Sequence, residues 1–388
     1  MKKKVKLLNI IAAVGTNELD LDYYEVGADI ESPDAIMVRS AAMHDMTFEP
    51  EMLAIARCGA GVNNIPVDRC SKEGIVVFNT PGANANGVKE LTLCALFLAS
   101  RRITDGIEWA KTLAGDADAA KTVEKGKSAF AGTEVQGKKL GVIGLGAIGG
   151  MVANAALHLG MEVMGCDPYL SVEAAWSLSR NVKRAASYEQ IFRECDYITL
   201  HIPATPETKN TINADAISVM KDGVKIINLA RADLVDAEAL KAGLAAGKVS
   251  AYVTDFPTPD IIGVSGVVAI PHLGASTEEA EDNCAVMAAH ELDDYLRFGN
   301  IKNSVNFPNV SMPHSGDVRI CLLHSNVPSI ISQITAALSE QHINIENMIN
   351  KSKGDNAYTL LEINGSVSDS TVAKIKSIEG MYRVRVIQ

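Results

Sequence analysis

The chain has 388 residues, of which 47% are hydrophobic, 21% charged and 5% aromatic. This length predicts two or three domains, each with enough apolar surface for its own core. The formal net charge of −11 argues against nucleic acid as a partner, because phosphate contacts require concentrated Lys and Arg. An anionic substrate therefore needs a local basic site.

The N-terminal residues 1–15, MKKKVKLLNIIAAVG, superficially resemble a secretory signal peptide. However, Asn9 interrupts the apolar run and no small-residue cleavage pattern follows, which favours a first β-strand preceded by solvated lysines. No apolar run approaches membrane-spanning length, so no membrane partner is expected. The seven cysteines form neither CxxC nor a His/Cys cluster, which predicts free thiols, a cytoplasmic location and no metal site.

Short apolar runs recur in the first 80 residues. Strands are expected at 5–12, 35–39 and 74–78, with another apolar run at 53–57. Their alternation with amphipathic segments indicates a parallel sheet in a first α/β domain. A long helix is then expected to start after Asn84 and continue to Arg101, and a small and charged stretch at 110–126 is expected to be a surface connection.

Residues 138–167 read KKLGVIGLGAIGGMVANAALHLGMEVMGCD, which indicates strand, glycine-rich turn, helix, strand and terminal acid. This order is the dinucleotide-binding fingerprint. Gly144 makes the tight turn, Gly146 lets the backbone approach a pyrophosphate, and Gly149 lets the helix pack against the strand. Backbone N–H groups and the helix dipole favour the bound anion. Asp167 suits a ribose 2′-hydroxyl and repels a 2′-phosphate, so NAD is favoured over NADP; a doubly wound sheet without a ligand is the structural alternative.

Further strands are expected at 196–201, 224–230, 249–256 and 267–270, and ligands are expected at their carboxyl ends. A helix-rich stretch at 274–298 follows. The last part of the chain has the order β-α-β-β-α-β, which is the ferredoxin-like pattern. The predicted fold is therefore α/β, with a Rossmann-type domain, a flavodoxin-like domain and a ferredoxin-like C-terminal domain.

Polar side chains at these strand ends are candidates for chemistry. Arg231 offers a planar fork of donors that suits bidentate capture of a carboxylate, although a surface ion pair is the simpler alternative. His272 can exchange a proton with a hydroxyl or carbonyl near neutral pH, although a lone histidine is more often structural. Asp255 and Asp260 are the nearby acids, and Asp260 could orient the histidine or be a solvated loop charge.

Several motifs in order resemble the D-isomer-specific 2-hydroxyacid dehydrogenase family. They are VRSA, GAGVNNI, VFNTPGANANGVKEL, GKKLGVIGLGAIG, CDPY, LHIPATPETKN, INLARADLVD and IPHLGAS, and they extend over most of the chain. The resemblance implies NAD-dependent oxidation of 3-phospho-D-glycerate to 3-phosphohydroxypyruvate, with His272 as acid/base and Arg231 as carboxylate anchor. Other readings are a glyoxylate or hydroxypyruvate reductase of this family, and a non-catalytic NAD-sensing protein.

The resemblance also implies which residues contact the ligands. The expected catalytic residues are Arg231, Asp260 and His272. The expected cofactor contacts are Gly144, Gly146, Ala147, Ile148, Gly149, Asp167, His201, Pro203, Thr208, Ala230, Asp255 and Gly274. The expected substrate contacts are Arg39, Ser40, Gly61, Val62, Arg231 and His272. The family pairs its histidine with a glutamate. Counting forward from Arg231 places Asp260 at the position of that glutamate, whereas aligning the segment 256–258 places Pro259 at the same position.

The implied domains are a discontinuous substrate domain at 1–84 and 280–308, an NAD domain at 85–279, a linker at 309–316 and a regulatory domain at 317–388. The last resembles an ACT domain, and His324, Asn326 and Asn344 resemble its serine-binding pattern. Ser329 stands where that pattern usually has Gly, so L-serine inhibition and a domain that only dimerises are both open. A homo-oligomer, dimer or tetramer, is expected because the ferredoxin-like tail offers edge strands for pairing.

Overall fold

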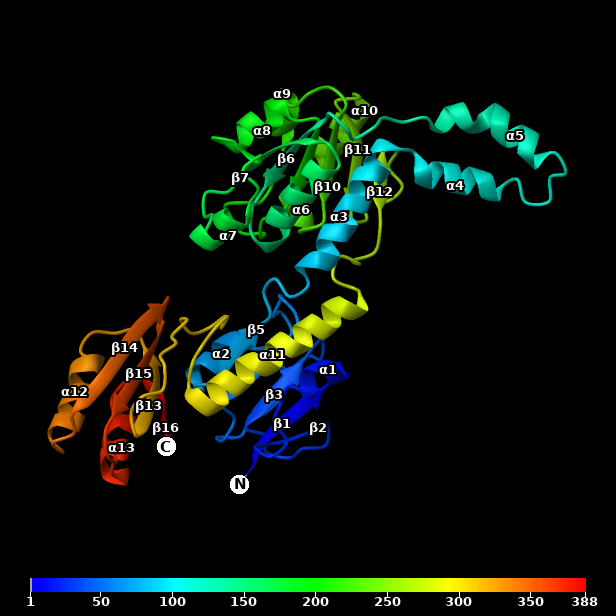
Figure 1. Ribbon diagram of the computed structural model, residues 1–388. Helices are drawn as coiled ribbons and strands as arrows, with labels where there is room; N and C mark the ends of the chain where they lie inside the picture. The colour runs from blue at the N-terminus through cyan, green and yellow to red at the C-terminus, as the bar shows by residue number, and fades with distance from the viewer. Residues whose placement is uncertain (1) are drawn as a thin grey trace. The chain divides into compact units, whose positions relative to one another are not determined.

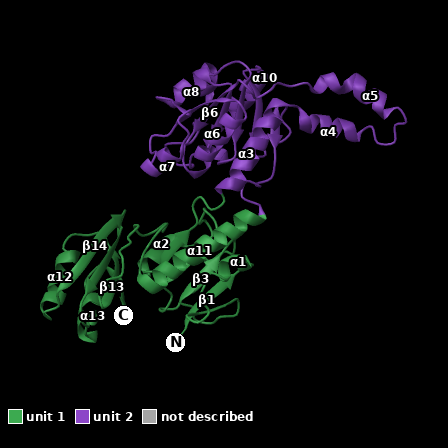
Figure 2. Ribbon diagram, viewed as in Figure 1, with its two compact units in different colours: residues 1–84, 278–388 green, residues 85–277 purple. Residues whose placement is uncertain are grey.

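The computed structural model describes residues 2–388 and divides into two compact units (Figure 2). Unit 1 consists of Met1–Asn84 with Glu278–Gln388, and unit 2 is Ala85–Thr277. Unit 1 thus contains both the predicted substrate domain and the predicted C-terminal domain. None of the helices in residues 2–388 has both the length and the apolar character needed to cross a membrane.

Unit 1 contains a five-stranded parallel sheet with the order β2-β1-β3-β4-β5. Its strands are β1 (Lys3–Leu8), β2 (Tyr24–Gly27), β3 (Ala35–Val38), β4 (Ala54–Arg57) and β5 (Val76–Asn79). The predicted end of the first strand at residue 12 is wrong. β1 ends at Leu8 because Asn9 adopts a left-handed φ of 69°, which cannot continue an extended strand.

Helices cover this sheet, and the longest of them begins directly after unit 2 in the sequence. They are α1 (Ala13–Thr16), α2 (Val67–Lys72) and α11 (Glu278–Phe298). The apolar side of α11 packs on the sheet in one core cluster that includes Ala288, Leu292 and Leu296. The segment after α11 also joins this domain, since the backbone N–H of Val77 donates to Asn306 Oδ1 at 2.9 Å.

Unit 2 contains a seven-stranded parallel sheet with the order β12-β11-β10-β9-β6-β7-β8, the doubly wound arrangement predicted from sequence. Its strands are β6 (Lys139–Ile143), β7 (Glu162–Cys166), β8 (Lys183–Arg184), β9 (Tyr197–Leu200), β10 (Val224–Asn228), β11 (Val249–Thr254) and β12 (Val267–Ala269). Its main helices are α3 (Ala85–Ser100), α6 (Ala147–His158), α7 (Val172–Ser177), α8 (Tyr188–Glu194), α9 (Ala214–Val219), the 3-10 helix η2 (Ala232–Leu234) and α10 (Ala237–Ala245).

A helical arm extends from the sheet of unit 2 (Figure 1). It is formed by α4 (Ile103–Lys111), α5 (Ala119–Gly126) and the 3-10 helix η1 (Lys127–Phe130). The rings of Trp109 and Phe130 hold its two sides together at a centroid distance of 5.1 Å. The stretch that was predicted to be a surface connection therefore forms a helical hairpin.

The C-terminal part of unit 1 has the predicted β-α-β-β-α-β order, with a four-stranded antiparallel sheet ordered β14-β15-β13-β16. Its elements are β13 (Val318–Ser325), α12 (Ile330–Ser339), β14 (Ile345–Lys353), β15 (Asn356–Ile363), α13 (Asp369–Lys376) and β16 (Met381–Ile387). Side chains such as Leu322 and Leu361 pack with the helices. On the opposite face, Cys321 and Tyr358 belong to the same core cluster as α11.

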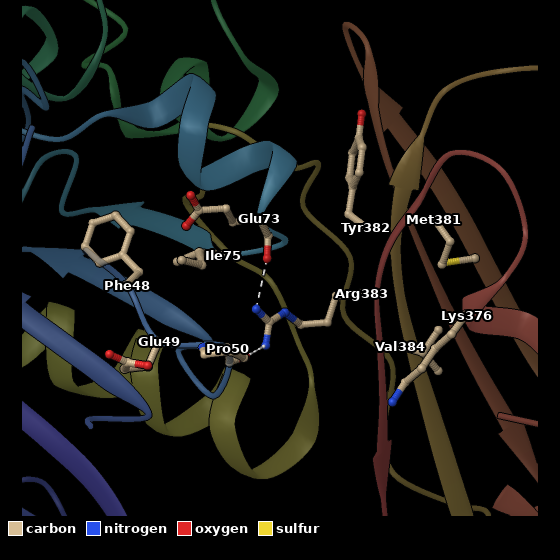
Figure 3. A pocket seen from close by; sticks show the side chains of 10 residues that line it. All are labelled: Phe48, Glu49, Pro50, Glu73, Ile75, Lys376, Met381, Tyr382, Arg383 and Val384. Atoms are coloured by element: carbon tan, nitrogen blue, oxygen red, sulfur yellow. Dashed lines mark hydrogen bonds between the residues drawn. The ribbon is translucent and has the colours of Figure 1, made fainter. Parts of the chain in front are cut away.

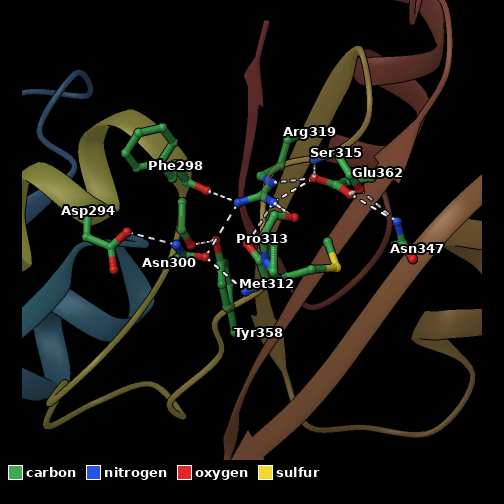
Figure 4. Close-up of polar contacts among 11 residues, drawn as sticks. Asp294, Phe298, Asn300, Met312, Pro313, Ser315, Arg319, Asn347, Tyr358 and Glu362 are labelled. Carbon is green, nitrogen blue, oxygen red and sulfur yellow. Dashed lines mark hydrogen bonds and ion pairs between the residues drawn. The ribbon is translucent and has the colours of Figure 1, made fainter.

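An ion pair between β13 and β15 is inaccessible to solvent, and hydrogen bonds connect it to the segment that precedes the sheet (Figure 4). Arg319 Nη2 lies 2.6 Å from Glu362 Oε1, and both side chains have 0% exposure. Arg319 also donates to the carbonyl oxygens of Phe298, Met312 and Pro313. Burial opposes ionisation of Glu362, but hydrogen bonds from Ser315, Arg319 and Asn347 lower its pKa to about 2.

Candidate active site

The turn after β6 has the geometry that a pyrophosphate requires. Gly144 has a φ of 88°, which favours glycine. A Cβ at Gly149 would overlap the carbonyl oxygen of Gly144, whereas a Cβ at Gly146 would meet nothing within 4 Å. Gly146 is also the N-cap of α6, so the open space lies at the positive end of a helix of 12 residues.

Asp167 closes this turn from the end of β7. Its Oδ2 accepts the N–H of Leu145 at 2.8 Å, and its Oδ1 accepts the N–H of Tyr169 at 2.8 Å. A cavity of about 290 Å³ begins at Asp167 and is lined by apolar side chains including Leu145, Leu170 and Leu178. An apolar slot beside a carboxylate fits the adenosine half of NAD. Arg184 also lines this slot, a cation that the sequence analysis did not single out.

The loop after β9 packs against the glycine turn. A Cβ at Gly144 would overlap the backbone of His201, and His201 Nε2 lies 3.0 Å from Thr199 Oγ1. Burial lowers the pKa of His201 to about 4, so its ring is neutral at pH 7. Thr208 Oγ1 donates to the carbonyl oxygen of Pro203 at 2.6 Å, which stabilises the loop internally. The contacts with the cofactor that were predicted for His201, Pro203 and Thr208 stay predictions.

Asp255, directly after β11, is a buried acid with an unsatisfied oxygen. It is 1% exposed; its Oδ2 accepts the N–H of Gly274 at 3.1 Å, while its Oδ1 has no partner among residues 2–388. Burial raises its pKa, and the Gly274 N–H and the charges of His272 and Arg231 partly oppose that rise. A buried acceptor without a donor fits the carboxamide N–H of a nicotinamide.

The ring of Phe256 brings Arg231 and His272 together. Arg231 Cζ lies 5.3 Å from the Phe256 centroid, and the His272 and Phe256 centroids are 4.3 Å apart with an interplanar angle of 45°. Arg231 Nη1 donates to the carbonyl oxygen of Ala230 at 2.6 Å, which leaves other donors of this exposed side chain for a ligand. The sequence analysis missed Phe256; its place between Asp255 and Pro257 was the available signal.

Asp260 has a different setting. It is exposed and lines a cavity of about 320 Å³ with Asp233 and Asp236, and its charge acts on Lys241 of α10. The acid whose pKa responds to the charge of His272 is Asp255. The pairing of His272 with Asp260 therefore stays a prediction.

The predicted substrate residues of unit 1 surround the ends of β3 and β4. Arg39 forms an ion pair with Glu281 of α11, and the carbonyl oxygen of Arg39 accepts the Nε–H of Arg57 at 3.1 Å. The N–H of Ser40 donates to Asn9 Oδ1 at 3.0 Å. Arg57 is a second half-buried guanidinium near Arg39, which the sequence analysis did not select.

The loop at 59–62 adds backbone groups to this region. Gly59 has a φ of 144°, and a Cβ there would overlap the Arg57 guanidinium. A Cβ at Gly61, next to Val62, would meet nothing within 4 Å. Asn79 Nδ2 holds the loop by donating to the carbonyl oxygen of Ala60 at 2.6 Å. This arrangement is compatible with the predicted substrate loop.

The three predicted effector residues differ in their exposure to solvent. His324 is 2% exposed, and its Nδ1 and Nε2 lie 2.8 Å from the Ser325 carbonyl oxygen and from Thr359 Oγ1. Asn326 and Asn344 are exposed. Ser329 adopts a left-handed φ of 70°, the conformation for which glycine is favoured at that position. Serine binding here stays a prediction.

Known proteins resemble this chain over most of its length. Residues 94–274 match the family described as D-isomer specific 2-hydroxyacid dehydrogenase, NAD binding domain. D-3-phosphoglycerate dehydrogenase of Haemophilus influenzae is 32% identical, over 95% of this chain and 92% of that protein. The Escherichia coli K12 protein of the same name is 30% identical, over 98% of this chain and 95% of that protein. The NAD⁺-bound 3-phosphoglycerate dehydrogenase of Entamoeba histolytica has a TM-score of 0.60 at 26% identity, over 79% of this chain and 99% of that chain.

Proposed function

The chain belongs to the family of D-isomer-specific 2-hydroxyacid dehydrogenases, and from this premise we propose that it oxidises 3-phospho-D-glycerate to 3-phosphohydroxypyruvate, the first step of L-serine biosynthesis. Relatives with the name D-3-phosphoglycerate dehydrogenase, 30–36% identical to the chain, support this substrate. The observation that carries the proposal is the grouping of Arg231, Asp255, Phe256 and His272 at the strand ends of the NAD-binding domain.

Each residue of this group has a separate task. Arg231 binds the carboxylate of the substrate through its free N–H donors, and the Phe256 ring restricts the position of the guanidinium. His272 accepts the proton of the C2 hydroxyl as the hydride leaves C2. NAD⁺, when bound, supplies the acceptor for that hydride. Asp255 orients the nicotinamide by accepting a hydrogen bond from the carboxamide.

Recognition of the phosphate is assigned to unit 1. In this proposal Arg39 and Ser40 bind it, with exposed N–H groups near Gly61 and Val62. Arg57, whose Nε donates to the Arg39 carbonyl, adds positive charge to the same region. Since Glu281 pairs with Arg39 in the absence of substrate, the phosphate has to replace that carboxylate.

Turnover by purified protein tests the proposal directly. NADH oxidation with 3-phosphohydroxypyruvate should be rapid, and His272→Ala should lower kcat by about 10²–10⁴-fold while NADH still binds. Arg39→Ala should reduce kcat/KM for the phosphorylated substrate far more than for hydroxypyruvate. Equal losses on both substrates would favour an unphosphorylated 2-keto acid, and tight NADH binding without turnover would favour a sensor.

Two further parts of the proposal concern partners. Ile103, Ile107 and Val123 of the helical arm are 43%, 50% and 37% exposed, which supports burial of the arm in a homo-oligomer. Mass determination in solution for wild type and Ile107→Ser tests this.

L-serine is proposed as an effector of the C-terminal domain through Asn326 and Asn344, and rates with and without serine test it. A cytoplasmic location is supported by cysteines that are all free and mostly buried.

A further inference from the structure

The C-terminal sheet presents a cationic face to the rest of unit 1. Residues opposite one another in an antiparallel pair lie on the same face, and Lys351 is opposite Tyr358 while Ile349 is opposite Leu360. Tyr358 and Leu360 belong to the core cluster that includes α11. The side chains of Lys351 and Lys353 therefore point towards the parallel-sheet domain of unit 1.

Most cations on this face donate to backbone carbonyl groups of that domain. Arg319 donates to Phe298, Arg385 to Tyr295 and Leu296, and Arg383 to Pro50 and Glu73. Lys353 Nζ donates to the Ser304 carbonyl at 2.8 Å. Lys351 is the exception, because its ammonium has no hydrogen-bond or ion-pair partner within residues 2–388.

Lys351 and Lys353 line a cleft of about 650 Å³ between β14 and residues 303–309. Its walls contain amide and hydroxyl groups but no carboxylate among the described residues, and they include Asn79, Asn303, Ser304 and Asn309. Burial lowers the pKa of Lys353, so a bound anion would stabilise its charged form. Although the chain has a net charge of −11, the lining of this cleft contains two ammonium groups and no carboxylate.

A second cleft between the same two domains serves as a comparison (Figure 3). Its volume is about 510 Å³, and Glu49 and Glu73 line it together with Lys376 and Arg383. Arg383 already donates to two carbonyl groups. Positive and negative charges therefore balance there, and the cleft at Lys351 is the better anion site.

Hydrogen bonds connect the Lys351 cleft to the loop at 59–62. The Asn303 carbonyl accepts the N–H of Asn79 at 3.3 Å, and Asn79 Nδ2 donates to the carbonyl of Ala60 at 2.6 Å. The other end of Asn303 is held by Glu291, since Nδ2 donates to Oε1 at 2.7 Å. A ligand that moves Asn303 thus changes the support of the loop.

We propose that the cleft between β14 and residues 303–309 binds a small phosphorylated anion through Lys351 and Lys353, and that Asn303 and Asn79 transmit its presence to the loop at 59–62. Lysine ammonium groups act as point charges for phosphate, and two of them match a dianion. The binding stands independently of the proposed reaction, whereas the effect on catalysis rests on it.

The binding test uses inorganic phosphate and the full-length protein with saturating NADH, which occupies the glycine turn after β6. An Arg39→Ala background removes the guanidinium of Arg39 from the proposed substrate phosphate site, so that phosphate binding there is weakened in every variant compared. In calorimetry, Lys351→Met should raise the Kd for phosphate at least tenfold, and Lys351→Met with Lys353→Met should abolish binding. Lys72→Met, at an exposed lysine of α2 in the same unit, is the matched control. Unchanged phosphate affinity in the Lys351 and Lys353 variants would overturn the site.

Two further comparisons ask whether the cleft recognises the phosphate group of a ligand and whether binding there affects catalysis. In the Arg39→Ala background, 3-phosphoglycerate should bind the cleft and glycerate should not; equal binding of glycerate would contradict phosphate recognition. With Arg39 intact, phosphate should change the KM for 3-phosphohydroxypyruvate in wild type. Asn79→Ala, which removes the Nδ2 donor to the carbonyl of Ala60, should bind phosphate but lose that change. An unchanged KM in wild type would refute the connection to the loop. Absence of turnover would count against the proposed reaction and leave the binding comparison intact.

Discussion

The two parallel sheets begin with the same strand–turn–helix unit and use their glycines in opposite ways. After β6, a Cβ at Gly146 would point into open space beside the start of a long helix. After β1, helix α1 has only four residues, and a Cβ at Gly15 would overlap the backbone of Ala285 in α11. A glycine near such a turn therefore indicates a ligand only where no other element fills the adjacent space.

The same contrast holds for two buried acids. Asp255 and Glu291 each have one carboxylate oxygen without a partner in the described part of the chain. Asp255 lies at a strand end near Arg231 and His272, whereas Glu291 lies within α11 and has Asn303 as its partner. The free oxygen of Asp255 is placed to accept a hydrogen bond from a ligand, whereas the carboxylate of Glu291 is enclosed by the protein itself.

Replacement of Glu291 should give the largest effect and sharpen this contrast. Burial raises the pKa of Glu291 from 4.5 to about 8, so between these values the folded chain keeps a proton that the unfolded chain releases. Its contribution to stability is full below about pH 4.5 and decreases by about 1.4 kcal/mol per pH unit as the pH rises towards 8. Glu291→Gln should remove that decrease, as thermal unfolding at pH 5.5, 7 and 8.5 would show.

The matched control is Glu25→Gln, at an exposed position of β2 in the same unit. Its melting temperature should follow that of wild type at each pH. A difference between Glu291→Gln and wild type that does not grow with pH would show that Glu291 is ionised in the folded protein.

Gly15→Ala should separate stability from cofactor binding. The added methyl group meets the Ala285 backbone, and overpacking of this kind typically costs about 1–3 kcal/mol. The melting temperature should fall, while the Kd for NADH should remain that of wild type. Weaker NADH binding in proportion to the lost stability would break the distinction between the two turns.

Gly146→Ala should have the reverse effect. The φ of this residue is −67°, which alanine adopts without strain, and its Cβ has no neighbour. Unfolding of the apoprotein should therefore be unchanged, while the Kd for NADH rises about tenfold, or about 1.4 kcal/mol, because the methyl group occupies the pyrophosphate position. Fluorescence titration with NADH measures this, and unaltered affinity would contradict the assignment.

Asp167→Asn should give the smallest change. Asparagine keeps an acceptor oxygen for the ribose, so the loss is the difference between a hydrogen bond to a charged group and one to a neutral group, about 1 kcal/mol. The cavity that Arg184 lines then has no carboxylate in its lining. The ratio of kcat/KM for NADH to that for NADPH should therefore decrease. An unchanged ratio would mean that Asp167 only supports the turn through the N–H groups of Leu145 and Tyr169.

Features encoded by local spacing were predictable from the sequence. The glycine turn, Asp167 and the three-part fold depend on residues close together in the chain. Phe256 was missed because its role depends on Arg231 and His272, which are distant in sequence, and Glu291 was missed because a glutamate in an amphipathic helix usually faces water. The short edge strands β2 and β8 have too few residues for a clear periodic pattern.

The arginines of the C-terminal sheet bear on how this protein can be divided. An ACT-like domain at the end of a chain is readily pictured as a detachable module. Here Arg319 and Arg385 supply the donors for the last carbonyl groups of α11, and Tyr358 donates to the carbonyl of Gly299. Deletion of residues 317–388 would expose one side of a shared core and the end of the helix that closes the parallel-sheet domain. A shortened chain would thus have to acquire a new ending for that helix before it could fold as an independent catalytic unit.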